Sequence, residues 1–337
     1  MPFERFMEQA LYHPIHGFFG SGQLRSVKAG DFLTSPEVSP LFGETLGRFI
    51  SLEHERLGEP FKLIEVGAGS GSLLGPLLAS LDFQPDTWAV ERSPAARQAI
   101  SDVLSTARVV DDFPRFDGGN NGVIIANELL DNLPMALAVR DVAGWFERWV
   151  GASDGDLVLV DSAARPSVAA WCEQFAGNVP EGGLVEVQLA ACEWVESAIS
   201  VLSRGWVLIF DYGDTAEGLL PRRTEGTLRT YRSHHLGPHP LDEPGATDIT
   251  ADVNFTALAS TAEMAGCRAT ISRQDDFLAG LGLRDRLSDL RNQELAMARS
   301  GNDLERLAVR SQKTEVETLL HPRGLGDFRV MAIQVGN

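Results

Sequence analysis

The chain has 337 residues, of which 44% are hydrophobic and 23% are charged, a composition typical of a globular protein rather than of a disordered or fibrous one. Aspartate and glutamate number 47 against 29 lysines and arginines, so the net charge is -18. Because this charge repels phosphate backbones and anionic lipid surfaces, nucleic acid and membranes are not expected partners, whereas cationic small molecules or basic protein segments are favoured.

The cysteines and the first residues bear on the compartment. Cys172, Cys192 and Cys267 are far apart and form no C-x-x-C pair, so neither a disulfide framework nor a zinc site is predicted. The N-terminal residues MPFERFMEQALYHP contain acidic side chains and no apolar leader core, and no uncharged apolar run approaches the roughly 20 residues that a bilayer span needs. These features predict a cytoplasmic protein.

Residues 1–55 are expected to form a separate lid or preface segment of loops and a helix. From residue 61 onward, strand-like and helix-like patterns alternate, and three short apolar runs bounded by turn residues are typical of buried strands: residues 63–67, 88–91 and 123–127. Because such alternation produces parallel strands joined by crossover helices, residues 56–136 are predicted to be the first half of a doubly wound core.

Residues 137–185 follow a different pattern, in which apolar and polar side chains alternate with a period of two and turns containing Asp-Gly interrupt the run. This pattern predicts an antiparallel insertion beside the main sheet. The second half of the core, with a substrate loop, is expected over residues 186–276. It includes a helix near 186–203, a buried strand over 206–214, and a helix followed by a strand over 255–274.

The C-terminal part is predicted to be helical before it returns to the sheet. Residues 277–320 carry leucines among charges at helical spacing, with a break at Ser300 to Asn302, which indicates a helical cap or a homodimer face. Residues 321–337 contain the final core strand, expected beside the strand at 206–214. The sequence thus predicts an α/β fold with a mostly parallel sheet, helices on both faces, an antiparallel insertion and a helical cap.

The first predicted strand ends in a glycine-rich turn that contains Gly67, Gly69 and Gly71. Glycines allow backbone amides to turn tightly and to approach a ligand at the start of the following helix. Two cofactor classes fit such a loop, a dinucleotide and S-adenosylmethionine (SAM). A dinucleotide requires G-x-G-x-x-G for its pyrophosphate, but the third position here is Ser72.

Acidic residues at the ends of the first three strands bear on the choice between a dinucleotide and SAM. Glu65 precedes the glycine loop, where a carboxylate favours the ammonium and sulfonium charges of SAM and repels a pyrophosphate. Glu91 closes the second strand, at the position that holds a ribose diol in either cofactor class. Asp111 and Asp112 follow the third strand; they are candidates for adenine recognition, or equally a solvated helix cap.

The fourth predicted strand ends in Asn127, Glu128 and, three residues later, Asp131. Polar groups at the carboxyl end of a parallel sheet lie beside the expected methyl group. Methyl transfer to nitrogen requires an acceptor that is oriented in line with the sulfonium and stabilised as charge develops. Carboxylates suit a guanidinium, so Glu128 and Asp131 are predicted to hold an arginine side chain, whereas a capping turn is the structural alternative.

A histidine cluster, formed by His234, His235 and His239 with Asp242, raises the question of a metal. The cluster lies in a loop rich in proline and glycine and lacks a helix that would aim two imidazole rings together, so no metal is expected. The chain also lacks the G-x-S-x-G elbow of hydrolases and the Walker A loop of phosphate-transferring enzymes.

Taken as a set, these residues resemble the MidA-like family of SAM-dependent methyltransferases, which includes a mitochondrial respiratory complex I assembly factor that methylates a protein arginine. The similarity extends over nearly the whole chain. It is carried by these segments: ALYHPIHGFFG, AGDFLTSPEVSPLFGE, EVGAGSGSL, ANELLDNLP, FDYG, GTLRTYRSH, PGATDITADVNFTAL, FLAGLGL and LLHPRGLGDFRV.

The resemblance implies a class I, Rossmann-like methyltransferase that binds SAM and releases S-adenosylhomocysteine. It also implies a cofactor site made by these residues: Thr34, Ser35, Glu65, Gly67, Ala68, Gly69, Gly71, Glu91, Asp112 and Asn127. Thr34, Ser35 and Glu37 would form a lid made rigid by Pro36. The sequence departs from the family pattern at Asp252, Asn254 and His239, where a histidine, an aspartate and an acidic residue are usual.

The function expected from these observations is SAM-dependent methylation of an arginine in a partner protein, linked to respiratory complex assembly, with Asn127, Glu128 and Asp131 as the catalytic residues. Three other functions stay open. One is a SAM-binding assembly chaperone with weak or no methyl transfer, which the altered Asp252 and Asn254 favour. Another is a small-molecule methyltransferase, and the third is a nicotinamide-dependent dehydrogenase.

Overall fold

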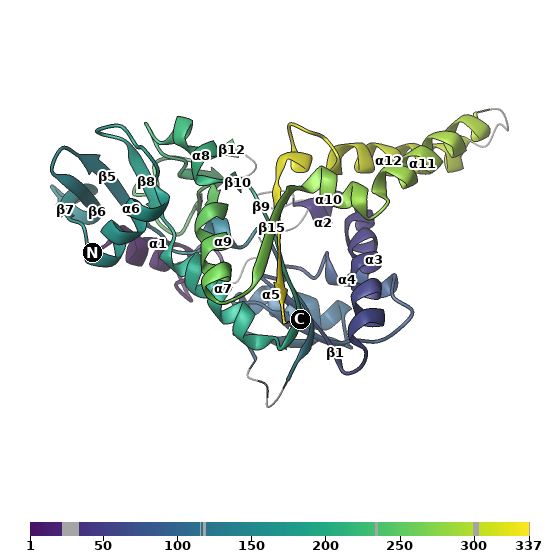
Figure 1. The fold of residues 1–337 in the computed structure, drawn as a ribbon. Helices are drawn as coiled ribbons and strands as arrows, with labels where there is room; N and C mark the ends of the chain where they lie inside the picture. Colours follow the sequence, from purple (N-terminus) through teal and green to yellow (C-terminus); the bar gives the residue numbers. More distant parts are fainter. Residues whose placement is uncertain (22–33, 115, 117–118, 233–234, 299–302, 337) are drawn as a thin grey trace.

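The computed structural model describes the chain except for residues 22–33, 115, 117–118, 233–234, 299–302 and 337. At its centre is a seven-stranded sheet with the strand order β15-β16-β9-β4-β1-β2-β3 (Figure 1). Its strands, in chain order, are β1 (Phe61–Val66), β2 (Asp86–Val90), β3 (Arg108–Val110), β4 (Asn121–Asn127), β9 (Arg204–Asp211), β15 (Arg268–Arg273) and β16 (Arg329–Val335).

The strands run as the sequence predicts. β3, β2, β1, β4 and β9 are parallel to one another, whereas β16 is antiparallel to both β9 and β15. Successive side chains of β4 enter different cores, since Val123 and Ile125 belong to the cluster on one face and Ile124 to the cluster on the other. A strand buried on both faces reads as a continuous apolar run, which explains why these strands were predictable.

Helices cover both faces of the sheet. One face packs against α3 (Pro40–Leu57), α4 (Leu74–Ala79), α5 (Pro94–Val103), α10 (Gln274–Gly280), α11 (Leu283–Met297) and α12 (Asp303–Leu319). The opposite face packs against α7 (Leu189–Val201) and α9 (Phe255–Met264). The predicted mostly parallel α/β fold with helices on both faces is therefore confirmed.

The predicted antiparallel insertion is also present, as a four-stranded sheet with the order β7-β6-β5-β8. It consists of β5 (Ala136–Asp141), β6 (Gly144–Ser153), β7 (Asp156–Ala163) and β8 (Leu184–Val187), with α6 (Pro166–Phe175) between β7 and β8. The helix predicted from residue 186 begins later, at Leu189. Val185 and Val187 pair with β5 instead and are buried against α6, so tertiary pairing overrides the helical pattern at this boundary.

The N-terminal segment and several short elements surround the carboxyl end of the central sheet. The helices and turns among them are α1 (Phe3–Tyr12), α2 (Ser35–Val38), α8 (Ala216–Leu219), η1 (Leu130–Asn132), η2 (Leu220–Arg222) and η3 (Leu325–Asp327). The strands are β10 (Gly213–Asp214), β11 (Arg229–Arg232), β12 (His235–Leu236), β13 (Asp248–Thr250) and β14 (Val253–Asn254). The amide of Ala251 donates to the carbonyl of Asp131 (3.2 Å), which fastens the segment after β13 to the η1 turn.

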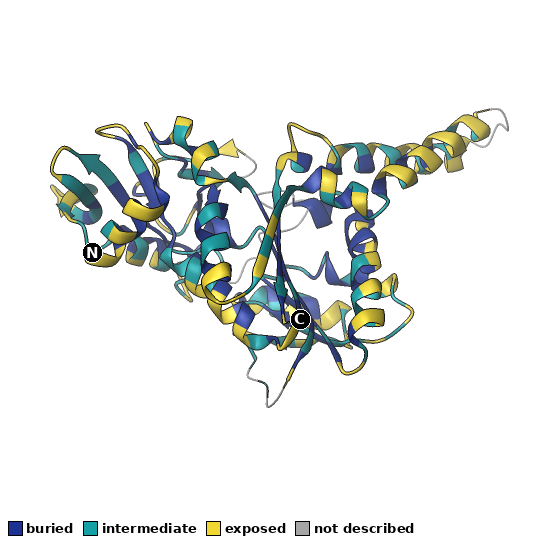
Figure 2. Ribbon diagram, in the orientation of Figure 1, coloured by how far each residue is buried: buried dark blue, intermediate teal, exposed yellow. Residues whose placement is uncertain are grey.

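The helical cap is a hairpin of α11 and α12 that projects from the body of the molecule (Figures 1 and 2). Its inner end is buried through Leu287, Leu290 and Val316, whereas Leu295 and Leu304 farther along are exposed. The predicted break at residues 300–302 lies outside the described residues. Within the described part of the chain, no helix combines the length and the apolar character required to span a bilayer.

Candidate functional site

A cavity of about 750 Å³ lies at the carboxyl ends of β1, β2 and β4, where ligands bind in open parallel sheets. Most of the residues predicted from the sequence line it: Thr34, Glu65, Gly67, Ala68, Gly69, Glu91, Asp112, Asn127 and Glu128. Ser35, Gly71 and Asp131 are not part of the lining. Most of the predicted cofactor residues therefore come together, but three predicted site residues do not line the cavity.

The glycine loop folds back under the end of β2. The amides of Gly67 and Ala68 both donate to the carbonyl of Val90, at 2.9 and 3.3 Å. Gly67 and Gly69 have φ angles of 73° and 54°, in the left-handed region that favours glycine. A side chain at Gly67 would also meet Leu129, because an added Cβ would lie 3.0 Å from its Cδ1 atom. The loop thus presents bare backbone to the cavity.

Glu91 connects the glycine loop to the start of α5. Its Oε2 atom accepts a hydrogen bond from the Gly69 amide (2.9 Å), and its Oε1 atom accepts one from the Ser93 amide (2.8 Å). Burial raises the pKa of this carboxyl, while both amide bonds favour the charged form and oppose the rise. Glu91 therefore shapes the loop and faces the cavity with the same carboxylate.

Among the described residues, three buried oxygen atoms of cavity-lining residues have no hydrogen-bond partner: Oε2 of Glu65, Oγ of Ser93 and Oδ1 of Asn127. Glu65 is only 3% exposed. Burial, with Glu91 nearby as a second cause, raises the pKa of Glu65 well above its usual value. Buried acceptors without donors are unfavourable unless a ligand supplies the donors, so this wall fits a cationic group such as an ammonium.

Aromatic side chains form the far end of the cavity. Phe113 follows β3 and Trp194 lies on α7; their rings are 5.9 Å apart, and both line the cavity. The predicted adenine residue Asp112 is exposed and accepts a hydrogen bond from the Phe113 amide (2.8 Å). Sequence reasoning missed Trp194, because no local pattern indicates that this residue of an amphipathic helix reaches the ligand site.

Helix α1 forms another part of the wall, although the sequence indicated only a preface. The Arg92 guanidinium lies over the Tyr12 ring at 4.4 Å and bonds to Glu8 (2.8 Å). The Tyr12 hydroxyl donates to the carbonyl of Asn132 (3.1 Å). The N-terminal helix thereby connects the loop after β2 with the turn after β4.

Glu128 stands at the turn between β4 and η1 with a φ angle of 50°, an uncommon conformation for a residue other than glycine. Its Oε1 atom accepts from the Ser35 amide (3.4 Å) and from the Asn127 side chain (3.3 Å). Burial, with Asp131 as a second cause, raises the pKa of Glu128 to about 8. A strained, cavity-facing carboxyl that titrates near neutral pH is typical of a functional site.

Asp131 does not lie beside Glu128 on the cavity wall. It is 3% exposed, and its carboxylate accepts hydrogen bonds from the hydroxyls of Thr250 and Tyr212. Asp211 stabilises the η1 turn, since its Oδ2 atom accepts hydrogen bonds from the amides of Leu130 (2.9 Å) and Asp131 (3.3 Å). The expectation of two carboxylates gripping one guanidinium therefore needs correction, because η1 places Asp131 behind the wall.

The predicted lid is described from Thr34 onward; its preceding residues 30–33 lie outside the described residues. Thr34 lines the cavity, and its amide donates to Glu37 (3.1 Å). Ser35 is fully buried, with its amide on Glu128 and its hydroxyl accepting from Gln274 (3.0 Å). The segment thus contacts the turn after β4.

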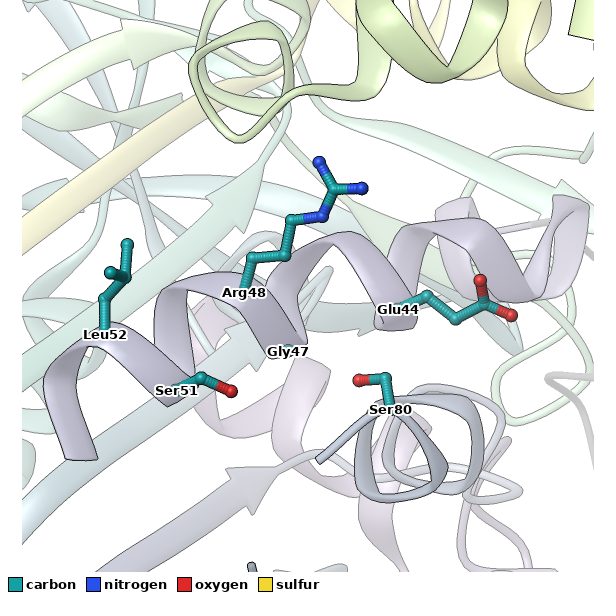
Figure 3. Close-up of a pocket in the computed structure, with 6 residues that line it drawn as sticks. All are labelled: Glu44, Gly47, Arg48, Ser51, Leu52 and Ser80. Atoms are coloured by element: carbon teal, nitrogen blue, oxygen red, sulfur yellow. The ribbon is translucent and has the colours of Figure 1, made fainter. Parts of the chain in front are cut away.

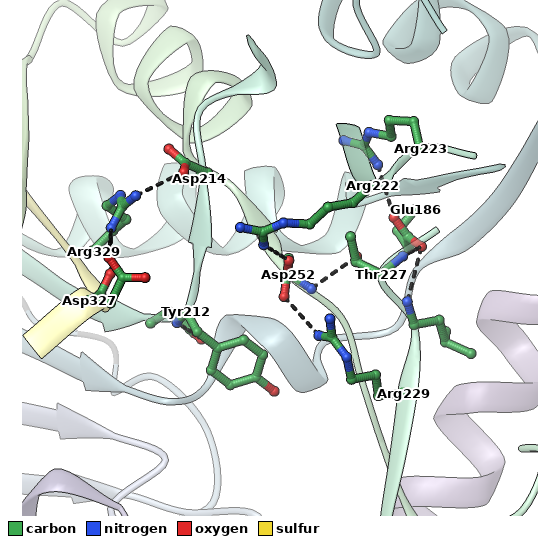
Figure 4. A network of polar contacts seen from close by, with 12 residues as sticks. Glu186, Tyr212, Asp214, Arg222, Arg223, Thr227, Arg229, Asp252, Asp327 and Arg329 are labelled. Carbon is green, nitrogen blue, oxygen red and sulfur yellow. Dashed lines mark hydrogen bonds and ion pairs between the residues drawn. The ribbon is translucent and has the colours of Figure 1, made fainter. Parts of the chain in front are cut away.

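Two of the departures from the family pattern, Asp252 and Asn254, have structural partners of their own, and Figure 4 shows those of Asp252. Asp252 is 4% exposed and forms ion pairs with Arg222 and with Arg229 (3.1 Å). Asn254 accepts from the Ala257 amide (3.2 Å) at the start of α9, and its side chain donates to the carbonyl of Phe175 (3.0 Å). Both side chains therefore hold the segment between β13 and α9.

Other candidate sites are weaker. His234 of the histidine cluster lies outside the described residues, and His239 accepts from the Leu241 amide (3.3 Å). In the part of the chain that the structure describes, no histidines, cysteines and acids gather in a group that could hold a metal. A second hollow of about 490 Å³ lies between α3 and Ser80, and its two charged side chains, Glu44 and Arg48, point apart (Figure 3).

Comparisons with known proteins agree on one family. The model of a family described as "Putative S-adenosyl-L-methionine-dependent methyltransferase", which is the MidA-like family, matches residues 45–272. The mitochondrial protein arginine methyltransferase NDUFAF7 of Xenopus tropicalis is 27% identical over 322 residues, covering 85% of this chain and 73% of the relative. Its human counterpart is 27% identical over 330 residues, covering 85% and 70%.

A solved structure matches nearly the whole chain. It is the crystal structure of a protein from Burkholderia thailandensis bound to S-adenosyl-homocysteine. The two sequences are 29% identical, the TM-score is 0.85, and the match covers 99% of this chain and 87% of that chain. This similarity agrees with SAM as the cofactor. The relatives also correct one expectation, because proteins named as mitochondrial contradict the prediction of a cytoplasmic location.

Proposed function

The chain belongs to the MidA-like family of SAM-dependent methyltransferases, and we propose that it methylates a guanidinium nitrogen of an arginine in a partner protein. The relatives named above are protein arginine methyltransferases, which supports this acceptor. The observation that carries the proposal is Glu128, a carboxyl on the cavity wall, at the end of β4. The net charge of -18 further favours a basic segment of the partner.

In this proposal, different residues of the cavity bind different parts of SAM. SAM supplies an electrophilic methyl group on a sulfonium that carries positive charge. The unpartnered oxygens of Glu65 and Asn127 would meet its ammonium, and the glycine loop would allow close approach of its methionine part. Glu91 would hold the ribose, with Phe113 and Trp194 around the adenine.

Glu128 would orient the acceptor. In the transfer, a nitrogen–carbon bond forms, the methyl–sulfur bond breaks with its electron pair passing to sulfur, and one proton leaves the guanidinium. A carboxylate beside the guanidinium holds its plane and offsets its charge. The positive charge of a bound guanidinium would lower the raised pKa of Glu128 and favour its carboxylate form, which is then able to take up that proton. Asp131 would act from behind the wall through its charge.

The experiment uses SAM with an isotopically labelled methyl group, incubated with the protein and a fractionated cell lysate. Labelled protein is hydrolysed, and its methylated amino acids are identified. We expect label in methylarginine, and a loss of about 100-fold or more with Glu128→Gln. Label confined to small molecules, or to lysine, would contradict the arginine proposal while leaving methyl transfer intact.

A further inference from the structure

Gln274, at the start of α10, stands close to the site although nothing in the local sequence marks it. Its side chain is fully buried, and its Nε2 atom donates to the hydroxyl of Ser35 at 3.0 Å. Its backbone amide donates to the carbonyl of Phe328 (2.8 Å), just before the last strand. The glutamine therefore connects a rigid part of the core to the short α2 segment.

Ser35 in turn contacts Glu128, the residue proposed to orient the methyl acceptor. Its amide donates to Oε1 of Glu128 at 3.4 Å, and the Asn127 side chain donates to the same atom at 3.3 Å. Hydrogen bonds of this length in a ligand-free site commonly tighten when the complex forms. In the described part of the chain these are the recorded donors to the Glu128 carboxylate, so the position of α2 matters for its charge.

The neighbouring charged groups that act most strongly on Glu128 are acidic. Asp131 lies behind it on η1, Glu37 approaches from α2, and Asp211 lies at the end of β9. All three repel the charged carboxylate, and burial disfavours it as well. The Ser35 and Asn127 bonds are thus the interactions that favour the form of Glu128 able to attract a cation.

We propose that Gln274 is a positioning residue that holds the Ser35 amide against Glu128 and so keeps this carboxylate able to accommodate the sulfonium of SAM. Within the described residues, the Oε1 atom of Gln274 is buried and has no hydrogen-bond partner. A buried acceptor without a donor is unfavourable, so an apolar residue of similar size would suit this position better if packing were its only role. The proposal rests on the proposed role of Glu128 at the methyl end of the cavity.

The consequence is a pH effect that requires no acceptor. The neutral form of Glu128 dominates below its pKa of about 8, so SAM affinity should rise as the pH increases through that value. S-adenosylhomocysteine carries no sulfonium charge, so its affinity should lack the part of this rise that Glu128 causes. Loss of the Ser35 bond would move the pKa of Glu128 upward and shift the rise in SAM affinity to higher pH.

The test is calorimetric titration of the whole protein with SAM and with S-adenosylhomocysteine between pH 6.5 and pH 9.5, values chosen to bracket about 8. For Gln274→Leu we expect SAM to bind about threefold to tenfold more weakly at pH 7, with recovery toward pH 9.5 and little change for the neutral product. Ser35→Ala, which removes the hydroxyl that Gln274 holds, should reproduce the shift, and Ser35→Thr should restore it.

Gln188→Leu is the matched control. Gln188 is 2% exposed; its amide group bonds to the Asp252 carbonyl (3.2 Å) and the Asn254 amide (2.8 Å), away from α2. Its substitution should leave the pH dependence in place. If Gln274→Leu and Ser35→Ala weakened both ligands equally at every pH, or left the SAM profile unmoved, the positioning role would be wrong. Either result is independent of whether arginine is the acceptor.

Discussion

The carboxylate of Glu91 accepts the backbone amide of Gly69 at 2.9 Å, so the residue expected to bind the ribose also holds the glycine loop in shape. Glu91→Ala removes an acceptor from two amides, those of Gly69 and Ser93, and should destabilise the protein by about 1–3 kcal/mol. It should also lower SAM affinity by at least about tenfold. Thermal unfolding and calorimetry measure the two effects separately.

Glu91→Gln provides the control for this pair of effects. The amide keeps one oxygen acceptor, so it should retain most of the stability and lose mainly affinity. A Glu91→Ala protein that binds SAM normally would contradict the ribose assignment, and one with unchanged stability would contradict the structural assignment.

Gly69→Val tests whether the bare backbone of the loop is required for binding. The φ angle of 54° disfavours a branched residue, and the new side chain would stand where the ligand approaches. We expect SAM binding to disappear. Gly266→Val is a matched control, because Gly266 also has a positive φ (77°) and an added Cβ there meets no atom within 4 Å. It should reproduce the backbone strain alone and leave SAM affinity unchanged.

Glu128→Gln should stabilise the ligand-free protein while it abolishes methyl transfer. The folded pKa of about 8 lies above the ordinary value of 4.5, so folding favours the protonated form. The carboxyl therefore destabilises the folded state progressively as the pH rises from about 4.5 to 8, and the effect is complete above 8. We expect a gain of about 1–3 kcal/mol at pH 8 and almost none at pH 5, measured by denaturant unfolding.

An equal effect of Glu128→Gln at both pH values would contradict the raised pKa. A stabilised variant with full methyl transfer would instead contradict the role of Glu128 in orienting the acceptor.

Strand ends were the part of the site that could be predicted from the sequence. Glu91 and Asn127 close buried parallel strands, and the carboxyl ends of such strands meet at one edge of the sheet. Tyr12, Trp194 and Gln274 could not be found in this way. They reach the site through the packing of helices that are distant in sequence, and their own helical patterns indicate only which face is apolar.

The pairing of Glu128 with Asp131 was wrong in its geometry for a local reason. A spacing of three residues puts two side chains on the same face of a regular helix. Glu128 has a φ angle of 50°, outside the helical region, so the chain reverses there before η1 begins and Asp131 turns toward Tyr212 and Thr250. Nothing in the residue pattern indicates a left-handed glutamate.

Two neighbouring arginines allow a test of how burial changes the contribution of an ion pair to stability (Figure 4). Arg223 and Glu186 are each 1% exposed and pair at 2.9 Å, whereas the Arg222 side chain, paired with Asp252, is 44% exposed. Arg223→Leu leaves a carboxylate buried without its counter-ion and should destabilise the protein by about 3–5 kcal/mol. Arg222→Leu should change stability by less than about 1 kcal/mol, because water screens that pair and Arg229 still neutralises Asp252. Denaturant unfolding of both variants gives the comparison, and equal losses would show that burial does not set the contribution of these pairs.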